Sequence, residues 1–143
     1  MISVNNLSEK EAAAGLQACR NELKKRDKAA VIAIADAQGE LITLLRLDGA
    51  PLASILIAAN KAWTAARERK PSRELGQSAR DPQTGFDMAY FGDRRYIGWG
   101  GGLPVFFQGK VVGALAVSGL PEHEDIEVAQ IGVQAILAAI EEK

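Results

Sequence analysis

Two basic side chains of this sequence stand among apolar or small neighbours, where an exposed charge is not expected. Lys61 shares one face of a predicted helix with Ile57 and Thr64, and a simple surface helix would be more charged there. If that face is covered, the ammonium group needs an acid or an anionic ligand group, because burying an unpaired ammonium is costly. The alternative is an exposed lysine whose stem lies along Ile57. Arg46 interrupts an apolar run and could pair with Asp48 or bind a carboxylate in bidentate fashion.

A run of glycines, Gly100 to Gly102, directly follows Trp99. Successive residues without a Cβ expose their amides and let a ligand or another chain reach the backbone. Most of the aromatic residues lie in the stretch that ends there, namely Phe86, Tyr90, Phe91, Tyr96 and Trp99. Because disordered segments are poor in aromatics, we expect this stretch to fold against something. The pattern favours the lip of a pocket for a flat, partly anionic molecule; an oligomer contact is the alternative.

Patterns for catalysis or metal binding are sparse. His123, the one histidine, could ligate a metal ion or carry protons, or it could be solvated in the first turn of the last helix. Cys19, the one cysteine, falls on an apolar helix stripe and is expected to pack in the core. The sequence has no nucleophile–histidine motif and no phosphate-binding loop. A carboxylate base such as Asp36, Asp48 or Asp125 remains open, so the residues favour binding over catalysis.

Helices and hairpins must position these residues. The sequence predicts a capped helix from Ser8, strands at 29–36 and 41–48, a helix that starts near Pro51 and stops before Pro71, a short helix at 72–80, strands at 105–107 and 110–119, and a last helix after Pro121. Tyr96 and Ile97 could begin a further strand. Because tight turns join antiparallel strands, we expect an α+β domain with helices packed on an antiparallel sheet.

The helix after Pro51 is predicted to bury one apolar stripe against the sheet. Its members are Leu52, Ile55, Leu56, Ala59, Trp63 and Ala66. Lys61 would then lie on the opposite face.

Length and composition bound the class of protein. The chain has 143 residues, 48% hydrophobic and 24% charged, which predicts a single folded domain over residues 1–143. A net charge of −1 gives no reason to expect a nucleic acid or a membrane surface as partner. The start of the sequence does not read as a signal peptide, and no run is long enough to cross a membrane. A lone cysteine fits a reducing compartment, so a cytoplasmic protein is expected.

Five stretches follow one another along nearly the whole chain: Arg46–Gly49, Lys61–Ala65, Pro71–Leu75, Gly101–Pro104 and Gly109–Gly119. With Asp125 and Ala129 in the last helix, they resemble the GlcG/HbpS/PduO C-terminal-domain family, the haem-degrading HbpS-like or DUF336 group. The resemblance implies a profilin-like α/β fold, with an antiparallel sheet of about five strands. It also implies homo-oligomers that bind haem or a related tetrapyrrole such as a corrinoid.

The predicted ligand-binding set is Arg46, Lys61, Thr64, Tyr90, Tyr96, Trp99, Gly100, Gly101 and Gly102. Its cations and glycine amides would hold the carboxylates of the ligand, and its rings would lie against the ligand plane. If haem is bound, the resemblance implies an iron ligand, with His123, Met88, Tyr90 and Cys19 as candidates. Two other hypotheses stay open: an accessory subunit whose aromatic loop forms an interface, and an enzyme for a small hydroxy or keto acid that uses Arg46 as carboxylate clamp.

Overall fold

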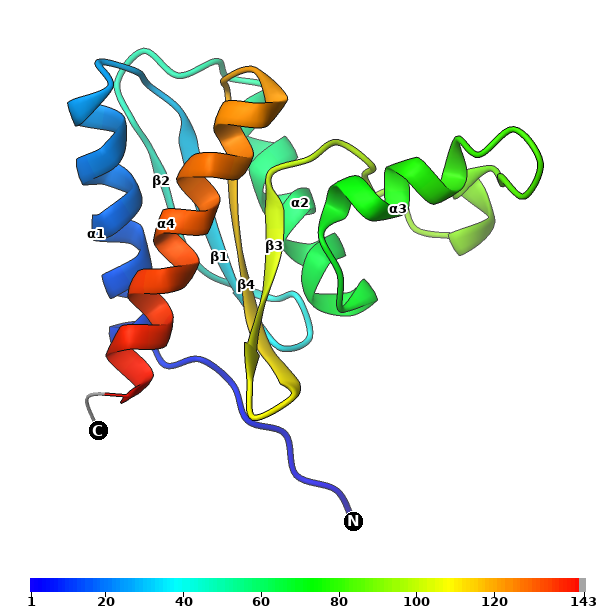
Figure 1. Cartoon of the computed structure of the whole chain (residues 1–143), viewed down its shortest axis with the longest axis horizontal. Coiled ribbons are helices and arrows are strands. Elements are labelled where there is room, and N and C mark those ends of the chain that lie inside the picture. The colour runs from blue at the N-terminus through cyan, green and yellow to red at the C-terminus, as the bar shows by residue number, and fades with distance from the viewer. Residues whose placement is uncertain (142–143) are drawn as a thin grey trace.

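The computed structural model describes residues 1–141 and places helices on both sides of one sheet (Figure 1). In chain order the elements are α1 (Glu9–Lys25), β1 (Val31–Asp36), β2 (Leu41–Arg46), α2 (Ser54–Glu68), α3 (Ser72–Ala79), the 3₁₀ helix η1 (Met88–Phe91), β3 (Gly102–Phe107), β4 (Lys110–Ser118) and α4 (Glu122–Glu141). The predicted α+β class is confirmed. Within this described range, no helix is long and apolar enough to cross a membrane.

The sheet is antiparallel, with the strand order β2-β1-β4-β3. Over residues 1–141 it has four strands, one fewer than expected. Tyr96 and Ile97 do not form a strand, because the Thr64 side chain takes the amide of Ile97 and the carbonyl of Arg95 instead. β3 is an edge strand, and this position tolerates Pro104, which has no amide hydrogen to donate.

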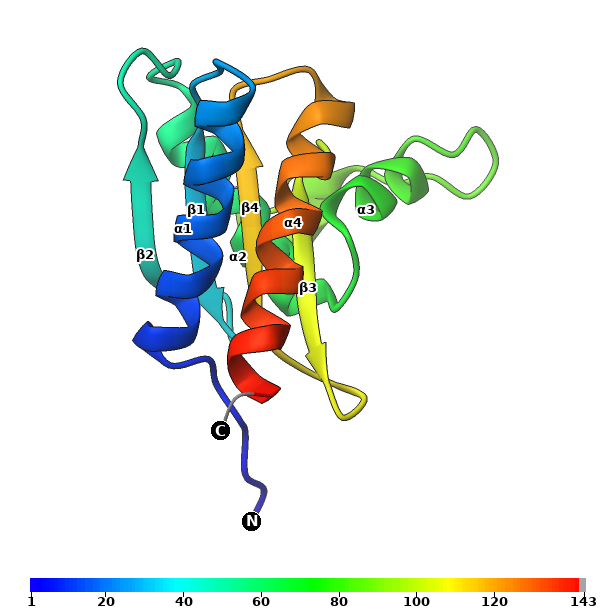
Figure 2. The same ribbon diagram turned by 60° about the vertical axis from the view of Figure 1, so that its left-hand side comes forward.

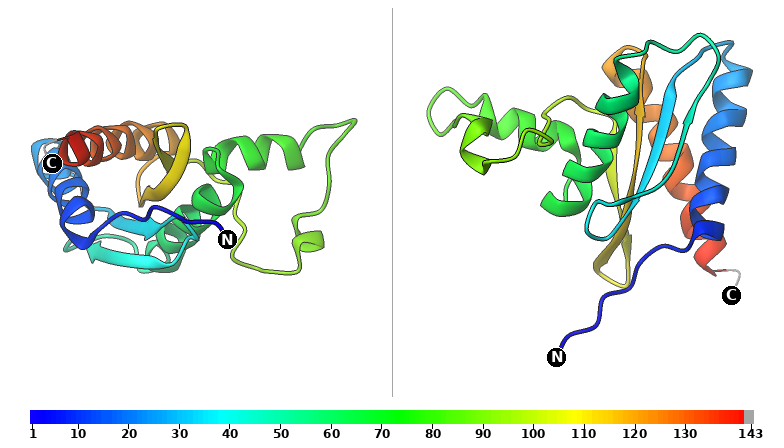
Figure 3. Two further views of the ribbon diagram at one scale, coloured as in Figure 1. Left: turned by 90° about the horizontal axis from the view of Figure 1, so that it is seen from below. Right: turned by 180° about the vertical axis from the view of Figure 1, so that it is seen from behind.

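Helices cover both faces of the sheet. α1 and α4 lie side by side on one face (Figure 2), and α2 lies on the other, as the view from behind shows (Figure 3). Alternation along β1 supplies both faces, because successive side chains of a strand point in opposite directions. Ile32 and Ile34 belong to the core under α1 and α4, whereas Ala33 and Ala35 belong to the core under α2.

The apolar stripe predicted for the helix after Pro51 is wrong at two positions. Leu52 and Leu56 are 71% and 67% exposed, and α2 begins at Ser54. The side chains that face the sheet are short ones, Ala58, Ala62 and Ala65, packed on the alanines of β1 and β4. Hydrophobicity alone predicts that the leucines are buried. The space between α2 and the sheet, however, has room only for the methyl groups of alanine.

Between α3 and β3 the chain forms an arm, residues 80–98, that projects away from the sheet (Figures 1 and 3). Ring contacts run along it: Phe86 meets Phe91 edge-on, Phe91 stacks on Tyr96 at 4.1 Å, and Tyr96 meets Trp63 of α2 edge-on at 4.7 Å. The expectation that this aromatic stretch folds against something therefore holds at its base, where Tyr96 packs on α2.

Candidate functional site

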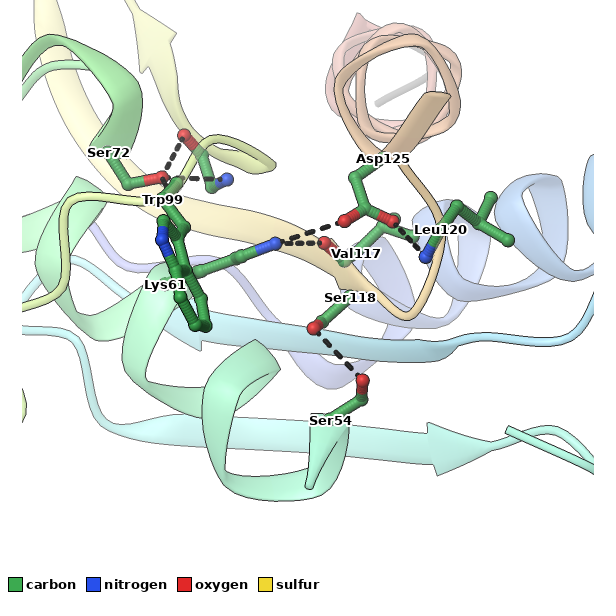
Figure 4. A network of polar contacts seen from close by, with 9 residues as sticks. Ser54, Lys61, Ser72, Trp99, Val117, Ser118, Leu120 and Asp125 are labelled. Atoms are coloured by element: carbon green, nitrogen blue, oxygen red, sulfur yellow. Dashed lines mark hydrogen bonds and ion pairs between the residues drawn. The ribbon is translucent and has the colours of Figure 1, made fainter. Parts of the chain in front are cut away.

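Lys61 of α2 and Asp125 of α4 form a buried ion pair near the end of β4 (Figure 4). The Lys61 Nζ lies 3.1 Å from Asp125 Oδ2 and donates to the Val117 carbonyl at 3.1 Å. Each residue is only 3% exposed. The amide of Leu120 donates to Asp125 Oδ1 at 3.0 Å, so the carboxylate also fastens the turn between β4 and α4. Lys61 is thus covered, and the acid it requires is Asp125.

Burial dominates the electrostatics of this pair. Desolvation lowers the pKa of Lys61 below its ordinary value, against the attraction of Asp125, which acts to raise it. Desolvation likewise raises the pKa of Asp125, against the attraction of Lys61 and the hydrogen bond from Leu120. Both shifts favour the neutral forms, as expected where the cost of removing two charges from water exceeds their mutual attraction.

The glycine run packs against this pair. Gly101 has a φ of +123°, and a Cβ there would lie 2.9 Å from Lys61 Nζ and 3.1 Å from the Asp125 Cβ. The amide of Gly102 donates to Ser72 Oγ at 3.0 Å, and the Ser72 hydroxyl donates to the Trp99 carbonyl at 2.7 Å (Figure 4). The missing side chains therefore let the start of β3 approach Lys61, and Ser72 of α3 fixes the run in place.

Trp99 stands between two depressions in the surface. One, of about 340 Å³, is lined by Lys61, Asp125 and Gly100, together with the hydrogen-bonded hydroxyls of Ser54 and Ser118. Trp99 lines it too, and its side chain is 58% exposed.

The second depression, of about 380 Å³, lies where the arm joins α3. Trp99 lines it together with Met88, Arg80, Phe86 and Ile97. Trp99 is therefore shared by a polar hollow and a more apolar hollow.

Three other residues of the predicted ligand-binding set, Thr64, Tyr96 and Tyr90, do not line the hollow beside Lys61. Thr64 is buried and binds the arm backbone, accepting from the Ile97 amide at 3.1 Å and donating to the Arg95 carbonyl at 3.2 Å. Tyr96 packs on Trp63 and lines neither Trp99 depression. Tyr90 is 87% exposed and also lines neither of them.

The remaining candidates lie elsewhere. Arg46 lines a separate hollow of about 430 Å³ with Asp48, beside the end of α1. His123 is exposed in the first turn of α4, and residues 1–141 contain no group of three side chains that could hold a metal ion. Cys19 is buried in the core, where desolvation raises the pKa of its thiol to about 12, so it remains protonated.

Sequence reasoning named Lys61, Trp99 and Gly100, which do line one hollow, but it missed their neighbours. The sequence suggests Asp125 as a possible general base and as part of the family resemblance, but not as the partner of Lys61, because no spacing rule connects it to a lysine on another helix. Ser72 falls in the Pro71–Leu75 stretch of the family resemblance but is not predicted as a site residue, and Arg80 carries no signal that distinguishes it from other polar residues. Their roles depend on the positions of α3 and the arm, which are set by tertiary contacts.

Several known proteins are similar to this chain. The sequence model of a family described as "Haem degrading protein HbpS-like" matches residues 7–134. Protein GlcG of Escherichia coli K12 is 33% identical over 112 residues, which are 78% of this chain and 81% of GlcG. The corrinoid adenosyltransferase PduO of Citrobacter freundii is 28% identical over 106 residues; these are 74% of this chain but only 32% of PduO.

Solved structures agree with the sequence matches. Protein ORFY of Klebsiella pneumoniae superposes with a TM-score of 0.91 at 28% identity, over 96% of this chain and 95% of that one. The structure of a PduOC:heme complex superposes with a TM-score of 0.84 at 25% identity, over 91% of this chain and 94% of that one. The shared fold therefore extends over nearly the whole chain.

Proposed function

The chain belongs to the HbpS-like family, and we propose that it binds a planar, carboxylate-bearing ligand, with haem or a corrinoid as first candidates. A relative with the same fold forms a complex with heme, and another similar protein is named for corrinoid chemistry. The single observation in this chain that carries the proposal is the indole of Trp99, exposed between two depressions. A large exposed ring next to concave surface offers a flat molecule a stacking partner.

Each Trp99 depression has one cationic side chain that would serve a carboxylate. Lys61 Nζ donates to Val117 and Asp125, and the third hydrogen of its ammonium group would serve a carboxylate at the polar hollow. Arg80 lines the other hollow and would hold a second carboxylate there. Haem, when bound, would supply an iron centre, and Met88 is the predicted iron-ligand candidate that lines a Trp99 depression.

Titration of the purified protein with hemin, followed by the Soret band, tests the proposal. Trp99→Ala should weaken binding about tenfold, the effect of losing one stacked ring. Met88→Leu should keep most of the affinity but shift the Soret maximum. Tyr90→Ala is the matched control, since it removes an exposed ring that lines neither depression. Binding that survives Trp99→Ala and falls with Tyr90→Ala would contradict this placement.

A homo-oligomeric accessory subunit is the second candidate, and exposed apolar side chains favour it. Leu52 and Leu56 lie uncovered on α2, and Tyr90 is uncovered on the arm. Surfaces of this kind mark protein contacts. Light scattering of Leu52→Ser/Leu56→Ser should show a smaller particle than the wild type, while a variant lacking residues 86–99 tests the arm in the same way. An unchanged mass in both variants would remove this support.

Two further points concern the location of the protein and the alternative that it is an enzyme. We place the protein in the cytoplasm because Cys19 is its one cysteine, so the sequence forms no disulfide within itself, which suits a reducing compartment. An enzyme for a small hydroxy or keto acid would instead use the hollow that Arg46 shares with Asp48. Turnover that persists in Asp48→Asn would remove that reading.

A further inference from the structure

A third concave surface lies apart from Trp99, at the end of the sheet near the N-terminal segment. This groove, of about 580 Å³, is the size of a small-molecule site. Four segments meet there, namely residues 3–5, the β1–β2 turn, the end of α2 and the β3–β4 hairpin, and Tyr96 of the arm completes the lining. In Figure 1 these segments gather toward the lower edge of the molecule.

The charge of the groove has one sign. Arg67, Arg69 and Lys110 line it, and none of its lining residues is an Asp or a Glu. Within residues 1–141, neither Arg69 nor Lys110 has an ion-pair partner. Arg67 is held in place, because its guanidinium lies over the Trp63 ring at 4.7 Å and donates to the Gln38 carbonyl. The groove therefore concentrates unneutralised positive charge on a partly fixed framework.

Arg69 occupies a backbone position that suits glycine. It caps the end of α2 with φ +57° and ψ +35°, the left-handed conformation. Helices commonly end in this conformation on a glycine, since any Cβ there is strained. An arginine at such a site places a charged side chain in the groove at the expense of backbone strain, which is a pattern of functional positions.

Apolar side chains line part of the groove. Phe106 and Val112 belong to the β3–β4 side, and Tyr96 closes the side formed by the arm. Behind Arg67 and Tyr96 lies Trp63, whose buried indole Nε1 is the one side-chain nitrogen or oxygen in the described part of the chain that is buried without a hydrogen-bond partner. A buried hydrogen-bond donor without a partner is rare, and this one lies directly behind the groove residues Arg67 and Tyr96.

We propose that this groove is a second ligand site, which binds an amphipathic anion: an aromatic body that carries a carboxylate or phosphate group. The anionic group lies against Arg69 and Lys110, and the aromatic body lies between Phe106 and Tyr96. The site shares no lining residue with either Trp99 depression, so it is independent of the planar ligand proposed there.

The probe is 1-anilinonaphthalene-8-sulfonate, an aromatic anion whose fluorescence rises on binding, compared with the uncharged N-phenyl-1-naphthylamine. Arg69→Gly is the decisive variant, because glycine relieves the backbone strain and removes the charge without loss of a fold contact. We expect it to weaken binding of the anion about tenfold, which corresponds to one lost charge-assisted hydrogen bond. Lys110→Ala should act in the same direction, while neither change weakens binding of the uncharged probe.

Asp27→Gly is the matched control, since Asp27 also has a left-handed φ of +55° after a helix but lies outside the groove. It should leave binding of the anion unchanged, as should Trp99→Ala. Equal binding by wild type and Arg69→Gly would overturn the proposal. So would a loss in Trp99→Ala as large as that in Arg69→Gly, because the probe would then sit on the other surface.

Discussion

The two faces of the sheet are both covered by helices, yet their cores are built from side chains of different size. Under α1 and α4 lie branched residues such as Leu23, Ile32, Leu115 and Ile136, all fully buried. Under α2 the core is almost entirely alanine, and the buried polar residues Ser54, Lys61, Thr64 and Ser72 border it. The two faces therefore use different means of holding a helix against the sheet.

The difference follows from what each side chain can contribute. A buried Leu removes three more carbons from water than a buried Ala, worth about 2 kcal/mol at roughly 0.8 kcal/mol per methylene. On the aliphatic face, this free energy of burying apolar carbon is enough to hold the helices against the sheet. The alanine face gains less from it, so close approach, hydrogen bonds and the Lys61–Asp125 pair must fix α2. The Lys61 hollow beside Trp99 lies between α2 and the start of α4, where the ion pair joins the helices of the two faces.

The largest effect should come from breaking the ion pair that fastens α2, the helix of the alanine face, to α4. Asp125→Ala leaves the Lys61 ammonium buried without its counter-ion and should lower the free energy of unfolding by about 4 kcal/mol, measured by urea denaturation. Lys61→Met with Asp125→Asn removes both charges, keeps an acceptor for the Leu120 amide, and should restore most of the loss. If the double variant is as unstable as Asp125→Ala, the unpaired charge of Lys61 is not the cause of the lost stability.

The exposed pair of Arg73 and Glu122 provides the control for that experiment. Its atoms lie 3.2 Å apart, a distance like that of the buried pair, but both side chains are well exposed. Glu122→Gln should change the free energy of unfolding by less than about 1 kcal/mol, because water screens and solvates both charges.

On the aliphatic face, deleting one side chain should cost somewhat less. Leu115→Ala opens a cavity between α1 and α4, whose Gly15 and Gly132 both lie against the Leu115 side chain. We expect a loss of about 3 kcal/mol in the free energy of unfolding by urea denaturation. Its neighbour Ala114 faces α2, and Ala114→Gly should cost only about 1 kcal/mol. Equal costs would remove the contrast between the faces.

Adding volume tests the alanine face directly. Ala62 is fully buried between α2 and the sheet, so Ala62→Leu should overpack this layer and cost about 2 kcal/mol by thermal or urea unfolding. Leu56→Ala on the outer side of the same helix should change stability by less than about 0.5 kcal/mol. A larger loss of stability in Leu56→Ala than in Ala62→Leu would mean that the hydrophobic stripe predicted from the sequence describes the packing of α2.

The same contrast explains what the sequence could and could not predict. Element order follows from local signals, such as the capping box at Ser8 and the prolines that bound the helices, and it is confirmed. The buried face of α2 was not predicted correctly, because Leu56 is more hydrophobic than Ala58. Only the short distance between helix and sheet makes Ala58 the buried residue. The partner of Lys61 was missed because Asp125 lies 64 residues away along the chain. No local pattern encodes such a contact.

The smallest expected effect is a difference in pH dependence between the wild type and the Lys61→Met/Asp125→Asn variant. Burial raises the pKa of Asp125, so stability from this group is present below its unfolded pKa of about 3.9 and is lost as the pH rises through the folded pKa. Burial lowers the pKa of Lys61, so stability from that group is present above its unfolded pKa of about 10.4 and is lost as the pH falls through the folded pKa. Relative to the variant, the wild type should therefore lose stability as the pH rises above about 4 and regain it toward about 10, in urea denaturations across that range. A wild type that gains stability over the variant just above pH of about 4 would show that attraction between the two charges outweighs their burial.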